Sequence, residues 1–243
     1  FRVTYRLRSA VASDWQADTI FGHLCWALRY LKGEDSLCQF LKQYELGPPP
    51  LVISNGFPGD FLPRPITAPQ ERLKGKTICE KIESFKADKE ARGIKLLSPQ
   101  EFNQAIRGEE IFPASEKKNL LRTRVTLKNQ ISRLTGTTGG EGNLYDFEET
   151  YWSYGEGGKV ADTPISTYVK VGDDFVKQTE HLFSFIAAQG YGKRKSVGYG
   201  EIRSQSFEAF DGFEYPAEAN GFVSLSNFAP AEGDPIEGTW QTI

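Results

Sequence analysis

The chain has 243 residues, of which 39% are hydrophobic and 13% aromatic, so it can form one large folded domain or two small ones. This composition excludes a disordered chain, and no apolar run approaches the length of a membrane-spanning helix. The net charge of −3 does not by itself predict a nucleic-acid partner, so local clusters of charge carry the information instead.

The first part of the chain predicts a strand, two helices and a second strand. Residues 1–8 alternate between apolar and polar side chains, which is typical of a half-buried strand with a basic outer face. Apolar residues at helical spacing predict a helix over residues 20–31, with Asp18 as its N-cap. A short helix over residues 36–44 and a strand over residues 51–53 follow.

A long insert comes next. Residues 58–75 are rich in Pro and predict an irregular connection, and residues 76–92 predict a charged helix. Ser98 and Glu101 form a capping box, which predicts a helix that ends near Ile106.

The second half predicts a hairpin followed by further strands and a helix. Residues 122–133 alternate, and residues 144–147 resume a strand, so the glycine-rich residues 135–142 are predicted as the mobile tip of a long hairpin. The later elements are a strand, an amphipathic helix and two more strands, at residues 166–171, 173–189, 200–207 and 222–226. This order predicts an α+β fold of the split βαβ, ferredoxin-like kind.

The sequence begins with Phe1 and contains no Met. A complete protein of this size rarely lacks Met, so we expect that residues are missing from the chain. Phe1 opens directly into the strand pattern, which predicts no secretory signal. Cys25, Cys38 and Cys79 form no metal-type pair and are interpreted as buried thiols. We therefore expect a cytoplasmic protein without a metal site.

The segment from Gly190 to Gly200 reads GYGKRKSVGYG, in which glycines flank three consecutive cations. Glycine permits positive φ, so backbone N–H groups can form an anion nest while the cations neutralise phosphates. Ser196 can donate a hydrogen bond, and Tyr191 or Tyr199 can stack on a base. The segment is not a nucleotide-binding loop of the two common kinds, because it follows a helix and precedes a strand. A flexible turn with solvated lysines is the competing interpretation.

Several segments together resemble the RAMP superfamily of CRISPR-associated proteins, and within it the Cas-five-like fourth subunit of type III-A (Csm) effectors. The matching segments are the glycine-rich loop, the first-helix motif, the loop after it, the central hairpin and a late strand, at residues 190–200, 18–24, 61–65, 124–145 and 225–230. The resemblance spans about residues 1–230.

This resemblance implies two ferredoxin-like units, which we place at residues 1–121 and 122–243, the second being truncated. It implies a non-catalytic subunit in antiviral defence that caps the effector complex at the 5′ repeat-derived handle of the guide RNA. It also implies contacts with the large polymerase-like subunit and with a backbone RAMP subunit, with no membrane partner and no cofactor.

The predicted RNA-binding residues belong to the glycine-rich loop and to the hairpin. They are Gly190, Gly192, Lys193, Arg194, Lys195, Ser196, Gly198, Tyr199, Gly200, Arg122, Arg124, Lys128 and Arg133. The hairpin cations can also be read as a solvated basic face, and we expect Lys128 to be the most exposed of them.

Three alternatives remain open. A RAMP-type, metal-independent endoribonuclease that processes repeat RNA would need a His as general acid or base, and the chain offers only His23 and His181, both in predicted helices. Cleavage of target RNA would use Asp18, which an N-cap role explains better. A pure assembly protein would not contact RNA, and the cationic loop argues against it.

Overall fold

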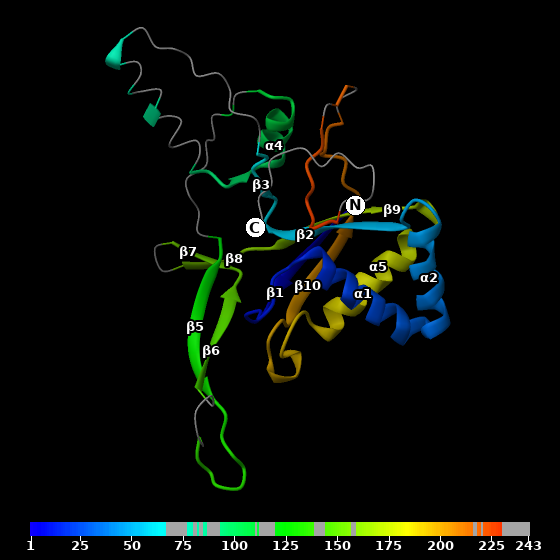
Figure 1. Ribbon diagram of the computed structural model, residues 1–243, viewed down its shortest axis with the longest axis vertical. Coiled ribbons are helices and arrows are strands. Elements are labelled where there is room, and N and C mark those ends of the chain that lie inside the picture. The colour runs from blue at the N-terminus through cyan, green and yellow to red at the C-terminus, as the bar shows by residue number, and fades with distance from the viewer. Residues whose placement is uncertain are drawn as a thin grey trace.

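The centre of the molecule is a four-stranded antiparallel sheet with the strand order β10-β1-β9-β2 (Figure 1). Its strands are β1 (Arg2–Leu7), β2 (Leu51–Pro58), β9 (Ile165–Val171) and β10 (Ile202–Glu208). The computed structural model describes residues 1–66, 77–79, 82, 85–86, 93–109, 111, 120–138, 144–156, 159–215, 218–219 and 221–229. Two strand-helix-strand halves interleave in this sheet, which is the split βαβ, ferredoxin-like arrangement that the order of elements predicts.

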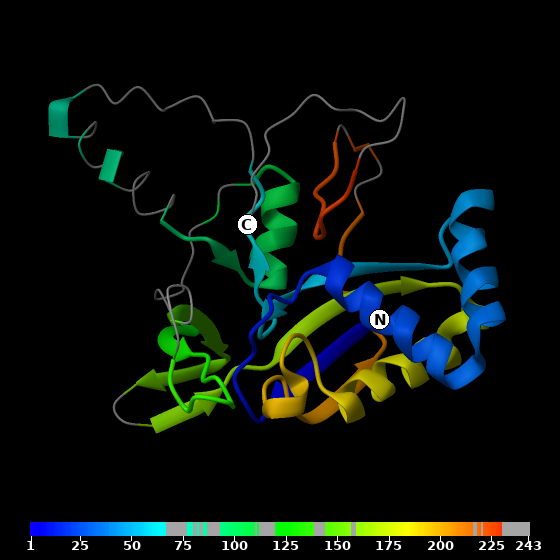
Figure 2. The same cartoon turned by 60° about the horizontal axis from the view of Figure 1, so that its bottom comes forward.

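Helices cover one face of the sheet (Figure 2). They are α1 (Ala17–Lys32), α2 (Glu34–Leu46) and α5 (Val176–Gln189), which follows the short 3-10 turn Asp173–Phe175. The alternation of β1 places Val3 and Tyr5 on this face, where both are fully buried. Leu24 of α1 and Phe183 of α5 pack against them in one continuous core.

Helix α1 begins one residue before the predicted N-cap, so the assignment of Asp18 is wrong. Gln16 is the N-cap, and its side chain makes no capping hydrogen bond. The side chain of Asn55 replaces it, because its Oδ1 accepts the N–H of Ala17 at 2.8 Å. Asp18 lies in the first turn, where its carboxylate accepts the N–H of Thr19 at 2.6 Å. An acidic group in this position still stabilises the helix dipole.

A second, smaller core forms on the opposite face of the sheet. It contains α4 (Pro99–Ile106) and the two-residue strands β3 (Leu62–Pro63) and β4 (Leu96–Leu97). Phe102 of α4 packs near Phe57 and Tyr168 of the sheet. The capping box of Ser98 and Glu101 is present as predicted. The charged helix predicted over residues 76–92 lies almost entirely outside the described residues.

A long hairpin extends away from the sheet (Figure 1). It pairs β5 (Arg122–Asn129) with β6 (Leu144–Tyr151), as the sequence predicts, and a shorter hairpin of β7 (Ser153–Glu156) and β8 (Lys159–Asp162) follows. Val11 fixes the long hairpin to the body of the protein. Its N–H and carbonyl exchange hydrogen bonds with Thr150 at 2.9 and 2.8 Å. Residues 139–143 of the predicted tip lie outside the described part of the chain.

The described residues form one ferredoxin-like sheet, and it takes two strands from each side of residue 121. The division into units at residues 1–121 and 122–243 stays a prediction, but the sheet does not follow it. The strand predicted over residues 222–226 is wrong, because this backbone is irregular. A hydrogen bond connects this segment to the sheet: the N–H of Asn55 donates to the carbonyl of Leu225 at 2.8 Å.

The cysteines also differ from expectation. All three are free thiols, but Cys38 and Cys79 are exposed and Cys25 is half-buried. Burial was expected because free Cys is usually an interior residue, and here α2 presents Cys38 on its solvent side. Within the described ranges, none of the helices has the length and apolarity that crossing a bilayer requires.

Candidate nucleic-acid interface

Tyr191 anchors the glycine-rich loop in the protein interior. Helix α5 ends at Gly190, which has φ of +79°, and the chain then turns inward. The Tyr191 ring is fully buried and stacks on Trp15 with 3.7 Å between the ring centroids. Its hydroxyl donates to the carbonyl of Asp14 at 2.7 Å. The prediction that Tyr191 can stack on a base is therefore wrong, because both its face and its hydroxyl are occupied.

The two ends of the loop lie against each other. The N–H of Tyr191 donates to the carbonyl of Gly200 at 2.9 Å, and the N–H of Gly200 donates to the carbonyl of Ala10 at 2.8 Å. Gly200 has φ of +67°, and a Cβ there would overlap the carbonyl oxygen of Tyr191. A Cβ on Gly190 would lie 2.9 Å from the Gly200 oxygen. Glycine is required at both positions by sterics and by conformation.

Protein acceptors also occupy most backbone donors of the loop. The N–H of Gly192 donates to Nε2 of His23 at 3.1 Å, and that of Lys193 donates to Oγ of Ser13 at 3.0 Å. The N–H groups of Val197, Gly198 and Tyr199 bond to carbonyls within the loop, around the 3-10 turn Lys195–Val197. These donors cannot form the predicted anion nest. The described acceptors leave the N–H groups of Arg194, Lys195 and Ser196, together with the side chains of the loop, for contact with phosphate.

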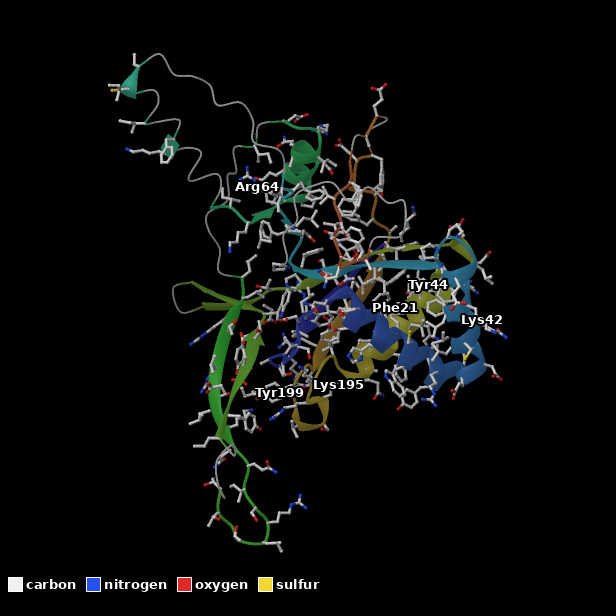
Figure 3. All side chains as sticks on the ribbon, in the orientation of Figure 1. Phe21, Lys42, Tyr44, Arg64, Lys195 and Tyr199 are labelled. Atoms are coloured by element: carbon white, nitrogen blue, oxygen red, sulfur yellow. The ribbon has the colours of Figure 1, made fainter. Side chains whose placement is uncertain are left out.

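The loop presents four polar side chains to solvent. Lys193, Arg194, Lys195 and Ser196 are all exposed, and Arg194 has a φ of +60° that is unusual for a residue other than Gly. Lys195 lies on the side of the loop toward α1, whereas Tyr199 lies on the side toward the long hairpin (Figure 3). The loop thus separates two surfaces, one on the hairpin and one on the helices.

Aromatic and cationic side chains join the loop to the hairpin. The guanidinium of Arg194 lies 4.4 Å from the ring centroid of Phe147, and its Nη2 donates to the hydroxyl of Tyr145 at 2.7 Å. Nζ of Lys128 lies 4.1 Å from the same Phe147 centroid and donates to the hydroxyl of Tyr199 at 2.7 Å. Lys128 is half-buried as a result, so the expectation that it is the most exposed hairpin cation is wrong.

Glu149 of β6 also takes part in this contact between the hairpin and the loop. The residue is buried, with 5% of its surface exposed, and its Oε2 accepts the hydroxyl of Tyr199 at 2.8 Å. Nε of Arg124 lies 3.9 Å from its Oε1. The described contacts therefore bring Lys128 and Arg124 to the loop, whereas Arg122 and Arg133 lie near opposite ends of the hairpin.

Sequence reasoning missed the hairpin residues Tyr145, Phe147 and Glu149. They alternate along β6, so they share one face, and the register pairs them with Lys128, Thr126 and Arg124. The alternation in the sequence indicates that these three residues share a face, but only the strand register shows which cations they lie opposite.

His23 supports the loop in a way that disfavours acid-base chemistry. Burial, with Lys195 nearby, lowers the pKa of His23 to about 4, so its imidazole is neutral at pH 7. Its Nε2 lone pair already accepts the N–H of Gly192. His181 lies on the exposed side of α5. Within the described ranges, no three His, Cys, Asp or Glu side chains gather as a metal site would require.

Mild acid is expected to destabilise the protein through His23. Its pKa is lower in the folded state (about 4) than the ordinary His value of 6.5, so the unfolded chain binds more protons between these values. The stability that neutral His23 contributes is present above pH 6.5 and is lost as the pH falls toward 4. Because the ring is only half-buried, we expect a loss of about 1–2 kcal/mol. Urea unfolding of the wild type and of His23→Gln between these pH values checks this.

The glutamine variant keeps an acceptor for the Gly192 N–H but does not titrate. The slope of unfolding free energy against pH is expected to be shallower for this variant than for the wild type. Equal slopes would show that His23 does not carry the effect.

Comparison with known proteins gives a fold likeness. Neither a protein-family model nor a curated protein sequence matches the chain. Two solved structures of a Csm1-Csm4 cassette contain a similar chain. The complex with AMPPNP gives a TM-score of 0.54 at 16% identity over 77% of this chain and 66% of that one. The complex with cA4 gives a TM-score of 0.55 at 16% identity, over 89% of this chain and 72% of the matched chain.

A Csm3-Csm4 subcomplex in the type III-A CRISPR-Cas interference complex gives a TM-score of 0.53 at 11% identity, over 84% of this chain and 68% of the matched chain. This chain thus spans about two thirds of the length of the solved chains it matches. Identities this low indicate a shared fold. The α+β, ferredoxin-like fold predicted from the sequence agrees with this likeness.

Proposed function

We propose that this protein is a non-catalytic, RNA-binding subunit of a type III CRISPR effector complex. It caps the complex at the 5′ repeat-derived handle of the guide RNA and contacts the large polymerase-like subunit and a backbone RAMP subunit. The fold likeness to chains of a Csm1-Csm4 cassette and of a Csm3-Csm4 subcomplex supports this assignment. On this assignment the protein acts in the cytoplasm.

The exposed cations of the glycine-rich loop are the observation that carries the RNA-binding role. Lys193, Arg194 and Lys195 lie side by side in the sequence on a loop whose backbone is held by buried Tyr191 and by Gly200. A rigid loop offers cations to a phosphate backbone at a lower entropic cost than a mobile one. Such contacts position RNA without reading its sequence.

The hairpin extends this surface. Arg194 contacts β6, and Lys128 of β5 contacts Tyr199 of the loop, so strand and loop form one cationic ridge. The aromatic rings of the ridge hold these cations in place, because Lys128 and Arg194 both lie over the ring of Phe147. A protein that only assembles the complex would not need cations and aromatic rings together on one surface.

A repeat-cleaving endoribonuclease is the second candidate function, and the properties of His23 disfavour it. With a pKa of about 4, His23 lacks at pH 7 the imidazolium proton that a general acid donates. Its Nε2 lone pair, which a general base would use, accepts the N–H of Gly192.

One experiment tests the proposal against this alternative. Labelled RNA that carries the repeat handle, and matched RNA that lacks it, are mixed with the full-length protein, alone and reconstituted with the large and backbone subunits. The samples are run on native and on denaturing gels without added metal. We expect a shift that depends on the handle, with intact RNA on the denaturing gel. Cut RNA would establish the endoribonuclease instead, and equal binding of both RNAs would refute the capping role.

A further inference from the structure

A hollow of about 680 Å³ lies between α1 and α5. It is lined by Trp26 and Tyr30 from α1, by Phe185 from α5 and by Lys195 of the glycine-rich loop. This volume falls within the range of sites that hold a small organic group.

Phe185 packs against the hydrophobic core, but Trp26 and Tyr30 are not part of it. Helix α1 already meets the core with Ile20, Leu24 and Leu28, all buried. Trp26 and Tyr30 lie on the other side of the helix and are 53% and 71% exposed. Single exposed aromatic residues need no explanation, but adjacent ones that line a hollow indicate a binding surface.

The three rings stack in a row, so a flat group could stack on an outer face of the row. Trp26 and Tyr30 lie with centroids 5.7 Å apart and planes 29° apart, and Tyr30 and Phe185 lie 6.2 Å and 24° apart. The planes are thus nearly aligned while large parts of their faces remain open to solvent. Nucleobases stack on such faces whatever their identity.

The charge at the hollow favours a nucleotide over an apolar protein segment. Lys195 is cationic, and the remaining lining residues include no carboxylate. The guanidinium of Arg29 lies over the Trp26 ring, 5.4 Å from its centroid, but it is paired with Glu34 at 3.0 Å, so Lys195 supplies the charge of the hollow. Gln189 offers both a donor and an acceptor, which suits the edge of a base.

The hollow is also continuous with the loop. Lys195 belongs to both, and His23 on the wall of the hollow accepts the N–H of Gly192. A phosphate beside Lys195 would therefore place its own nucleotide, or the next one, at the mouth of the hollow. We infer that the hollow between α1 and α5 takes one unstacked base of single-stranded RNA, which stacks upon Trp26 or Tyr30. This inference rests on the proposed RNA-binding function.

The test uses the full-length protein reconstituted with the large and backbone subunits. Fluorescence anisotropy measures its affinity for handle RNA and for the same RNA with a single abasic nucleotide at each position in turn. We expect Trp26→Ala/Tyr30→Ala to weaken binding about 10- to 100-fold, as loss of base stacking does. One abasic position should weaken wild-type binding similarly and have no further effect on this variant.

Two controls separate stacking from folding. Trp26→Phe/Tyr30→Phe keeps the rings and should bind within about threefold of the wild type, since stacking tolerates a change of aromatic group. Tyr215→Ala removes a ring that is 86% exposed and lies outside the hollow, so it should leave affinity unchanged. The salt dependence of Trp26→Ala/Tyr30→Ala should equal that of the wild type, because no phosphate contact is lost.

Each other outcome overturns the inference in a different way. If Trp26→Ala/Tyr30→Ala binds RNA normally while a variant without the loop cations does not, the base does not enter the hollow and the proposed function stands. If this variant binds RNA but no longer assembles, the hollow docks a protein. If the wild-type assembly binds no handle RNA, the inference and the proposed function both fail.

Discussion

Replacing Lys193, Arg194 and Lys195 together by alanine is expected to weaken binding of handle RNA about 50-fold at about 0.15 M salt. Each cation that pairs with a phosphate of a single strand releases about 0.7 of a counterion, so the slope of log affinity against log salt should fall by about 2. Titration of labelled handle RNA at several salt concentrations measures both quantities.

A matched triple variant controls for the change in net charge. Lys42, Lys170 and Lys177 are exposed and belong to α2, the end of β9 and the start of α5, away from the loop. Figure 3 shows Lys42 on the far side of the molecule from Lys195. Alanine at these three positions should change affinity less than about threefold. Equal losses in the two variants would mean that the loop binds RNA through overall charge alone.

The substitution Gly200→Ala is expected to lower the free energy of unfolding by about 3 kcal/mol or more, because two costs add. The φ of +67° is unfavourable for alanine, and the new Cβ overlaps the backbone oxygen of Tyr191. The overlap cannot be relieved by rotating a side chain, so the loop must separate from the Tyr191 backbone. The midpoint of urea unfolding gives the loss in stability.

Gly198 supplies the control within the same loop. It also has positive φ, at +92°, but a Cβ there meets no atom within 4 Å. Gly198→Ala should therefore cost only the conformational penalty of about 1–2 kcal/mol. If the two variants are equally stable, the contact between Gly200 and Tyr191 does not hold the loop closed.

Features that depend on neighbours in sequence could be predicted. The alternation at residues 1–8 gave β1, and the capping box of Ser98 and Glu101 gave the start of α4. Both patterns reflect backbone geometry within a few residues. The order of strands and helices likewise indicated the ferredoxin-like arrangement of the sheet.

Features that depend on contacts between residues distant in the sequence could not be predicted. The N–H of Ala17 is capped by Asn55, 38 residues away, so local sequence pointed to Asp18 instead. Lys128 and Tyr199 are 71 residues apart, and their contact requires the hairpin to fold back toward the loop. The inward direction of Tyr191 was equally hidden, because it depends on the position of Trp15. In each case tertiary packing determined what the side chain does.

The strand order of the sheet has a consequence for synthesis on the ribosome. Strand β1 is made first, yet its two hydrogen-bonded neighbours are β9 and β10, with Arg2 opposite Tyr168 and Glu208. Strand β2 also pairs with β9 and not with β1. The nascent chain must therefore carry two unpaired strands, each with an uncovered apolar face, until β9 (Ile165–Val171) has left the exit tunnel. Unpaired strand edges invite association between chains. Slow translation at low temperature would prolong this exposure, whereas a chaperone that binds the first 60 or so residues would protect them.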